Sequence, residues 1–372
     1  MSAPPRPMGA SACTREPPRQ MRAPWHILQN GYCMFRPVLK FIFRIAAWLS
    51  GMLAFALLTI SLYHRFQIFQ ESSLIERPIG QLVEVDGKRL NVYTTGMGDR
   101  TLVFLSGLGT NAPTLDFKAL YSRLENDYRV VVVERLGYGY SDDGDDDRSL
   151  DKQLSQTRKA LKTAEISGPY VLVPHSMAGL EAVHWANRHP EEVEALIGLD
   201  MSIPPTRIPD QRLYQISWLA KNLGLARLPI LYDIRSTPTL RSGTLNRQDE
   251  SVFRALFHRR SITQAVMNEV KEMNKNLDTI RHEPVPQVPT LIFAAIQKGG
   301  STGSNDKKEK AFVAQNPQAK LITMEGPHYI HDYKPEEIAR YIRKFLSTIK
   351  QKQSRQSQAP QASRNPSSTV LT

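Results

Sequence analysis

The sequence has few of the residues that signal a disulfide framework, a metal ion or a cofactor. Its 372 residues include only two cysteines, Cys13 and Cys33, and both precede the long apolar run described below. A disulfide framework and a catalytic thiol are therefore excluded for the rest of the chain. The chain also lacks a His-Glu-x-x-His motif and a glycine-rich dinucleotide fingerprint, so we expect no metal and no cofactor.

The sequence also has fewer acidic residues than basic ones. The chain has 48 Lys and Arg residues against 36 Asp and Glu residues, which gives a formal net charge of +12. Much of the excess lies in the two terminal tails, and no nucleic-acid-binding motif accompanies it. A basic flank beside a membrane segment explains the charge more simply, so no nucleic-acid partner is expected. The composition leaves the oligomeric state open.

One long run of the chain has no charged residue at all. The run Ile45–Tyr63 has nineteen residues, and at ~1.5 Å per residue in a helix it spans roughly 28 Å, the thickness of a bilayer core. A cleaved signal peptide would have a shorter apolar region that ends in a small-x-small site, whereas this run ends in Ser61-Leu-Tyr-His-Arg65. We therefore predict an uncleaved transmembrane helix at residues 41–65, with a signal peptide as the alternative.

The charges on either side of this run predict its orientation. Arg22, Arg36, Lys40 and Arg44 precede it, whereas Arg65 and Arg77 after it are offset by Glu71 and Glu76. Lys and Arg are retained on the cytoplasmic side of a membrane. We therefore predict a single-pass membrane protein with a cytoplasmic N-terminus and an extracytoplasmic large domain.

Short, continuous apolar runs alternate with helical patterns through most of the remaining chain. The runs are Thr101–Leu105, Arg129–Val133, Tyr170–Val173, Val193–Leu199, Thr290–Ala294 and Ala319–Thr323; the helical patterns between them are Leu115–Glu125, Ser149–Ala164 and Leu180–Arg188. Continuous apolar runs suit parallel strands that are buried on both faces. A hairpin pattern at Gln81–Val85 and Arg89–Tyr93 adds an antiparallel edge. The predicted fold class is α/β, a mostly parallel sheet flanked by helices.

The alternation stops between residues 203 and 288, where aromatic and basic residues and two helical patterns, around Gln211–Leu223 and Ser251–Asn276, predict a helical lid over the sheet. The predicted organisation is a disordered basic segment (1–40), the transmembrane helix (41–65), the first part of the core (78–202), the lid (203–288), the second part of the core (289–349) and a disordered tail (350–372).

The stretch from Tyr170 to Trp185 predicts a nucleophile. A β-branched run is followed by Pro174-His-Ser-Met-Ala-Gly179 and then at once by a helical pattern. This is the order of a strand, a sharp turn and a helix, with Ser176 at the tip of the turn. Such a turn exposes the hydroxyl and aims the Met177 N–H at the same point.

A serine hydroxyl needs a base, and a base needs an acid that orients it. His328, in Met324-Glu-Gly-Pro-His-Tyr-Ile-His331, follows a Gly-Pro turn after the last strand, and we predict it as the base. His331 is interpreted as a polar packing residue. For the acid we favour Asp200, at the end of a predicted strand, over Asp306, in a Gly- and Ser-rich stretch.

Four motifs in this order resemble the α/β-hydrolase superfamily: Leu105-Ser-Gly-Leu-Gly109, Glu134-Arg-Leu-Gly-Tyr-Gly-Tyr-Ser-Asp142, the Ser176 turn and the His328 turn. The resemblance covers roughly residues 81–349. It implies Ser176 as nucleophile, His328 as base and the backbone N–H groups of Leu108 and Met177 as oxyanion hole. The sequence departs from the family pattern at Pro174 and Ala178, where glycines are usual, and at Ser106. The usual acid position, after Phe293, is empty.

These residues predict a membrane-anchored serine hydrolase that cleaves a small-molecule carboxylic ester through an acyl-enzyme. The partners expected are this ester, which could be lipid-like, and the membrane through residues 41–65. Two alternatives remain open at this point. One is a non-catalytic hydrolase-fold protein that binds or senses a ligand, and the other is an acyltransferase that uses the same site.

Overall fold

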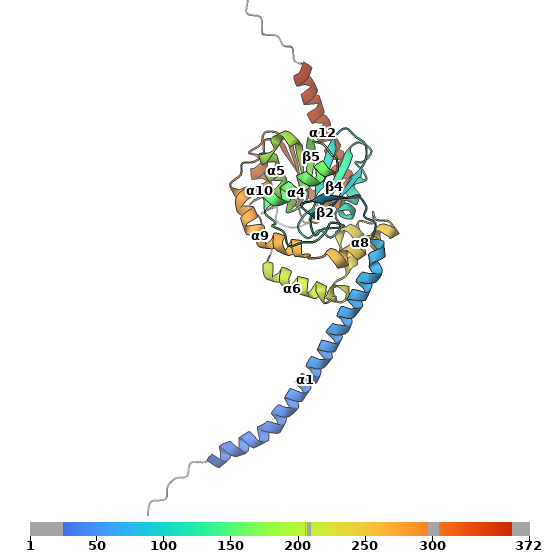
Figure 1. Ribbon diagram of the computed structural model, residues 1–372. Helices are drawn as coiled ribbons and strands as arrows, with labels where there is room; N and C mark the ends of the chain where they lie inside the picture. The colour runs from blue at the N-terminus through green and yellow to red at the C-terminus, as the bar shows by residue number, and fades with distance from the viewer. Residues whose placement is uncertain (1–24, 205, 207–209, 297–304, 359–372) are drawn as a thin grey trace, which may run out of the picture. The chain divides into compact units, whose positions relative to one another are not determined.

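The computed structural model of the protein describes residues 25–204, 206, 210–296 and 305–358 (Figure 1). The chain divides into two compact units, one up to Leu58 and one from Thr59 onward. The second unit, called here the sheet domain, contains the whole sheet. The predicted disorder of residues 1–24 and 359–372 falls outside the described residues.

The sheet domain is built on one eight-stranded sheet with the strand order β1-β2-β4-β3-β5-β6-β7-β8. The strands are β1 (Gln81–Val85), β2 (Lys88–Thr95), β3 (Thr101–Leu105), β4 (Arg129–Glu134), β5 (Tyr170–Pro174), β6 (Val193–Leu199), β7 (Thr290–Ile296) and β8 (Ala319–Glu325). Pairs β1–β2 and β2–β4 are antiparallel and all later pairs are parallel. The predicted α/β fold with an antiparallel edge is confirmed.

Both faces of the sheet are covered by helices, which explains why its strands are continuously apolar. On one face, Val103 and Leu172 pack in the same core as α4 (Leu150–Thr163) and α5 (Ala178–Arg188). On the other face, Phe104 packs in the same core as α3 (Lys118–Tyr121) and α12 (Pro335–Gln358). The remaining core helices are α2 (Pro113–Asp116), η2 (Pro190–Glu192), α10 (Asn305–Val313) and α11 (Ile330–Tyr333).

The lid is helical, as predicted, and consists of α6 (Gln211–Asn222), η3 (Leu225–Arg227), η4 (Ile234–Ser236), α7 (Pro238–Arg241), α8 (Arg247–Arg260) and α9 (Gln264–Arg281). The helical pattern over Ser251–Asn276 is broken into two helices. Ile262 has a φ of +48°, and the Thr263 side chain caps α9 by accepting from the Val266 N–H at 3.3 Å. Residues in the left-handed region interrupt a helix, and a Thr cap begins the next one.

Two other boundaries differ from the prediction. The pattern at Leu115–Glu125 forms two one-turn helices, α2 and α3, which are separated at Phe117. Helix α1 (Trp25–Gln70) begins within the segment that was predicted to be disordered, and it is followed by η1 (Glu71–Leu74). The stretch Pro37–Leu74 is long and apolar enough to cross a membrane, and its most hydrophobic window is 0% buried. Helix α12 likewise runs on to Gln358, into the predicted tail.

Candidate active site

Ser176 lies in the sharp turn between β5 and α5 and has a φ of +52°. This left-handed conformation is strained for a residue with a side chain, and strain of this kind gathers at functional sites. Neighbouring backbone holds the turn in place, because the Ser202 N–H donates to the Ser176 carbonyl at 2.7 Å and the Gly179 N–H donates to it at 2.9 Å.

Two glycines allow other backbone to approach this turn closely. A Cβ on Gly107 would lie 2.7 Å from the Ser176 Cβ, and a Cβ on Gly179 would lie 2.6 Å from the Ser202 carbonyl oxygen. The usual elbow glycine is replaced by Ala178, whose side chain is fully buried in the core. The close contacts between this turn and neighbouring backbone are therefore made at Gly107 and Gly179. Because these contacts do not fall at positions 174 and 178, the turn can accommodate Pro174 and Ala178.

The structure brings Ser176, His328 and Asp200 together at the carboxyl edge of the sheet. His328 Nε2 lies 2.8 Å from Ser176 Oγ, and His328 Nδ1 lies 2.6 Å from Asp200 Oδ2. A carboxylate only accepts hydrogen bonds, so this geometry places the imidazole proton on Nδ1 and leaves Nε2 to accept the serine proton. This is the arrangement that the predicted roles of nucleophile, base and orienting acid require.

Asp200 is held rigidly at the end of β6. Its φ is +43°, its N–H donates to the Phe293 carbonyl at 2.8 Å, and its Oδ1 accepts from the Ala295 N–H at 2.8 Å. Its carboxylate therefore bonds to β7, the strand after which the family usually places the acid. Asp306, the alternative, is the second residue of α10, and its side chain is outside the part that the structure describes.

The backbone N–H groups of Leu108 and Met177 both adjoin Ser176, one through Gly107 and the other as its next residue. Within the described residues, neither N–H donates a hydrogen bond to another backbone or side-chain group. By contrast, the next amide of the same loop, Gly109 N–H, donates to the Tyr138 hydroxyl at 3.0 Å. The two predicted oxyanion donors are therefore free to bind a ligand oxygen.

A buried charged network that the sequence did not indicate supports this loop. Arg135 donates to the carbonyls of Ser106 at 2.7 Å and Gly107 at 3.4 Å, and its guanidinium lies 3.1 Å from Glu269 of lid helix α9. The Tyr138 hydroxyl donates to Glu269 at 3.0 Å, and burial, followed by the nearby Glu269 charge, raises the pKa of Tyr138. The loop that contains Ser106 and Gly107 is thus connected to lid helix α9 through the buried side chains of Arg135, Tyr138 and Glu269.

Sequence reasoning could have found only part of this network. Arg135 and Tyr138 lie in the Gly-rich turn Glu134–Asp142, which was noted for its glycines. Glu269 is more than one hundred residues away, on an amphipathic helix where a Glu normally indicates a solvated face. Only the fold brings it against Arg135.

A cavity of about 430 Å³ opens beside the same loop and continues under the lid. Its lining includes Gly109 and Asn111 from the core and Ser217, Lys221, Tyr232 and Phe257 from the lid. Most of these groups are apolar or neutral. Burial lowers the pKa of Lys221, while Asp143 counters this change. The space beside Gly109, the residue that follows the predicted donor Leu108, is therefore a largely apolar cleft with one amine in its wall.

The strand order, the strained serine turn and the helical insertion define the class as an α/β-hydrolase fold. The comparison with known proteins agrees, because residues 100–228 match the family described as "alpha/beta hydrolase fold". The chain is 31% identical to the uncharacterized protein YbdG of Bacillus subtilis (strain 168) over 324 residues, which cover 84% of this chain and 98% of YbdG. The chain belongs to the α/β-hydrolase fold family.

Solved structures with this fold have low sequence identity. An epoxide hydrolase from Vigna radiata aligns with a TM-score of 0.57 at 17% identity, over 74% of this chain and 99% of that chain. A thermophilic esterase from Thermogutta terrifontis aligns with a TM-score of 0.56 at 18% identity, over 72% and 97%. At these identities the likeness establishes the fold alone.

Proposed function

We propose that this protein is a membrane-anchored serine hydrolase that cleaves a carboxylic ester with an apolar acyl group. The observation that carries the proposal is the continuous chain of contacts from Asp200 through His328 to Ser176. In the proposed reaction, Ser176 Oγ attacks the ester carbonyl while His328 Nε2 accepts the hydroxyl proton. The N–H groups of Leu108 and Met177 stabilise the oxyanion, which at comparable sites contributes about 3–4 kcal/mol per donor.

Asp200 orients the His328 ring and stabilises the imidazolium that forms after proton transfer. His328 then donates its proton to the leaving alcohol, and the acyl-enzyme remains on Ser176. A water molecule, activated by His328, hydrolyses this ester and regenerates the serine hydroxyl. A serine at this position favours ester chemistry over epoxide opening or dehalogenation, where an aspartate attacks the substrate carbon.

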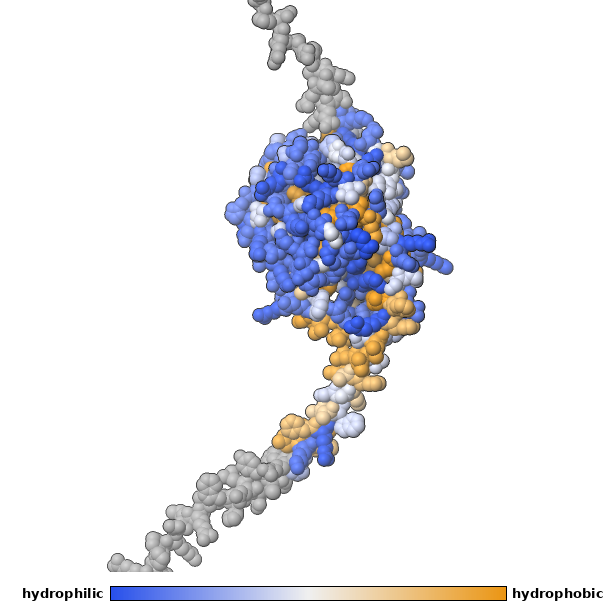
Figure 2. All heavy atoms as spheres, viewed as in Figure 1, coloured by the Kyte–Doolittle hydropathy of each residue, from blue (hydrophilic) through white to orange (hydrophobic). Residues whose placement is uncertain are grey.

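The apolar side chains of the lid support a substrate drawn from lipid. Helix α6 has no buried residue, and it exposes Leu213, Ile216, Trp218 and Leu219. Figure 2 shows a mostly hydrophilic domain surface with hydrophobic residues gathered at the lid end. Exposed apolar patches of this kind mark sites of contact with lipids or partners.

The lid is also fixed to the end of the predicted anchor and to the segment that follows it. Arg227 of the lid makes a bidentate ion pair with Glu71, at 2.6 and 2.8 Å, and donates a hydrogen bond to the His64 ring at 3.0 Å. Arg259 donates to the Ser72 hydroxyl at 2.7 Å. These contacts keep the apolar face of the lid close to where the chain would leave a bilayer.

Active-site labelling tests the proposal. A fluorophosphonate probe should modify wild-type protein in detergent, and Ser176→Ala should remove the label. A series of p-nitrophenyl esters should then show a rise in kcat/KM with acyl length up to the capacity of the cleft. Folded protein that resists the probe and hydrolyses none of the esters would leave the non-catalytic alternative.

A further inference from the structure

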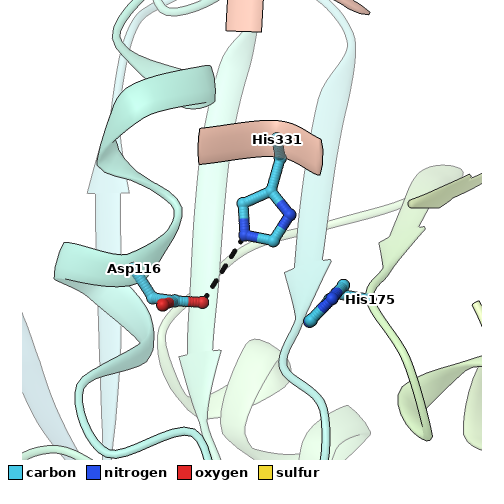
Figure 3. A group of neighbouring side chains, drawn as sticks. All are labelled: Asp116, His175 and His331. Atoms are coloured by element: carbon cyan, nitrogen blue, oxygen red, sulfur yellow. Dashed lines mark ion pairs between the residues drawn. The ribbon is translucent and has the colours of Figure 1, made fainter. Parts of the chain in front are cut away.

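A second group of ionisable side chains lies next to the serine turn and takes no part in the proposed reaction. Asp116 ends α2, His175 directly precedes Ser176, and His331 lies in α11 (Figure 3). Three separate elements thus bring these residues together in the interior. The side chains are 3%, 1% and 0% exposed, respectively.

The polar atoms of this cluster lack the hydrogen bonds that buried groups normally make. Asp116 Oδ1 accepts from the Thr239 hydroxyl at 2.6 Å, but Asp116 Oδ2 has no hydrogen-bond partner among the described residues. The same is true of both ring nitrogens of His331 and of His175 Nδ1. Unsatisfied buried groups are rare in folded proteins, because each lowers the stability of the fold.

The charge around the cluster is also unbalanced. Asp332, the neighbour of His331, is 4% exposed and both of its carboxylate oxygens lack a partner in the described part of the chain. Among the described residues, no Lys or Arg forms an ion pair with Asp116 or Asp332. Within the described residues, the buried Asp116 carboxylate therefore lies beside two imidazoles without a Lys or Arg partner, although buried charges are normally paired or bound to metal.

We propose that Asp116, His175 and His331 bind a divalent transition-metal ion of the zinc class. One ligand atom from each residue lies within 4.8 Å of the others, and His331 Nε2 lies 3.5 Å from Asp116 Oδ2. Two atoms bound to one tetrahedral Zn²⁺ at ~2.0–2.2 Å lie about 3.4 Å apart, so this pair already has the required spacing. The ligand atom of His175 lies within 4.8 Å of the other two, so its side chain would move inward to reach the same spacing. Two imidazoles and a carboxylate are a zinc-type ligand set.

The position of this site gives the metal a structural effect on the proposed active site. His175 is bonded to Ser176 in the chain, and its Nε2 lies 3.3 Å from the carbonyl of His328. His331 lies three residues after His328, in helix α11. A metal that binds His175 and His331 would therefore fix the residue before Ser176 and the helix that follows His328. This role makes the bound ion a stabiliser of the site and assigns it no part in the bond-breaking steps.

Metal content tests the proposal directly. The full-length protein is expressed in medium supplemented with Zn²⁺ and purified in detergent. It should contain about one zinc ion per chain, as measured by elemental mass spectrometry. Expression with Co²⁺ should give a visible absorption spectrum typical of a low-coordinate site. Because the cluster is closed to solvent, the ion should resist brief treatment with a chelator and leave on unfolding.

Matched variants locate the ion. Asp116→Asn and His331→Gln should each lower the zinc content at least tenfold, whereas Ser176→Ala should leave it unchanged. His189→Gln is the control, because His189 forms a surface cluster with Glu191 and Glu192 and should retain the metal. Wild-type protein that folds, labels with the probe and yet contains under one-tenth of an equivalent of metal would overturn the proposal. Zinc retained in His331→Gln and lost in His189→Gln would overturn it as well.

Discussion

The edge of the sheet and the lid above it are built in opposite ways. The strands that end at the candidate active site consist almost entirely of buried side chains; Val173, Leu199 and Phe293 are each 0% exposed. Helix α6 of the lid has none, and Ile216 is 64% exposed. The difference shows that apolar residues have two roles here. In the sheet they form the core that fixes the strand ends and the polar side chains that follow them. On the lid they form an exposed surface that is available for binding.

This contrast divides the expected effects of substitution. Changes at the sheet edge should remove activity on every substrate, because they alter the reacting atoms. Changes on the exposed face of lid helix α6 should affect only how a substrate arrives. The buried ion pairs between Arg135 and Glu269 join the two regions, and a change there should affect both stability and rate.

The largest effect is expected for Ser176→Ala. Loss of the nucleophile should lower kcat by about 10⁴- to 10⁶-fold, because the remaining groups still bind and polarise the ester but cannot form an acyl-enzyme. Steady-state hydrolysis of a p-nitrophenyl ester measures this effect, and circular dichroism checks that the variant is folded. Residual activity above one-hundredth of wild type would show that another group is the nucleophile.

Asp200→Asn should have the next largest effect. An amide favours the wrong tautomer of His328, so kcat should fall about 10³- to 10⁴-fold while KM changes little. The control is Asp306→Asn, which should retain more than half of wild-type activity. Comparable losses in both variants, or a greater loss at Asp306, would show that the contact of Asp200 with His328 is not the one used in the reaction.

The strands could be predicted because local patterns determine them, and Ser176, His328 and Asp200 could be chosen because each follows a predicted strand. Continuous apolar runs predicted β3 and β6 with their observed bounds, and the alternating hairpin pattern did the same for β1. A carboxylate directly after such a run can occupy only the strand end, which is where Asp200 lies.

Other features depend on residues that meet only in the folded chain. The Arg135–Glu269 pair and the Asp116–His331 contact each join elements far apart in sequence, and no spacing rule connects them. His331 was interpreted as a packing residue because a single histidine gives no sign of an unpaired aspartate beside it. The break between α8 and α9 likewise depends on one left-handed residue, Ile262, of a type that seldom adopts this conformation.

Glu269→Gln tests the connection between the two regions. The substitution leaves Arg135 and Arg148 buried with one fewer carboxylate, and breaking a buried pair costs about 3–5 kcal/mol. Urea unfolding should show this loss, and kcat should fall because the carbonyls of Ser106 and Gly107 lose a fixed partner. Glu272→Gln, which alters an exposed pair with Lys275 on the same helix, should change stability by less than about 1 kcal/mol. Equal effects of the two variants would refute the connection.

On the lid, Ile216→Glu and Leu219→Glu should lower hydrolysis of an ester presented in lipid vesicles. Burying an aliphatic side chain contributes about 1.5–3 kcal/mol, so the loss should be roughly tenfold or more. Hydrolysis of a short, water-soluble ester should stay within twofold of wild type. Gln215→Glu places the same charge at another exposed position of α6 and should have little effect on either substrate. A parallel loss on both substrates would place these residues in the cleft and not at a lipid surface.

The smallest effect is a dependence of lid stability on pH through His258 in α8. Burial, followed by the charge of Arg227, lowers the pKa of His258 to about 4, whereas an unfolded histidine titrates near ~6.5. Between these values the unfolded chain binds more protons than the folded one, so stability falls as the pH decreases from about 6.5 toward 4. His258→Gln should flatten this slope by about 1 kcal/mol once solvent screening of the partly exposed ring is considered. The measurement is the urea midpoint at pH 7 and pH 5, with the exposed His282→Gln as control. An unchanged slope in His258→Gln would show that other groups on the lid cause its response to acid.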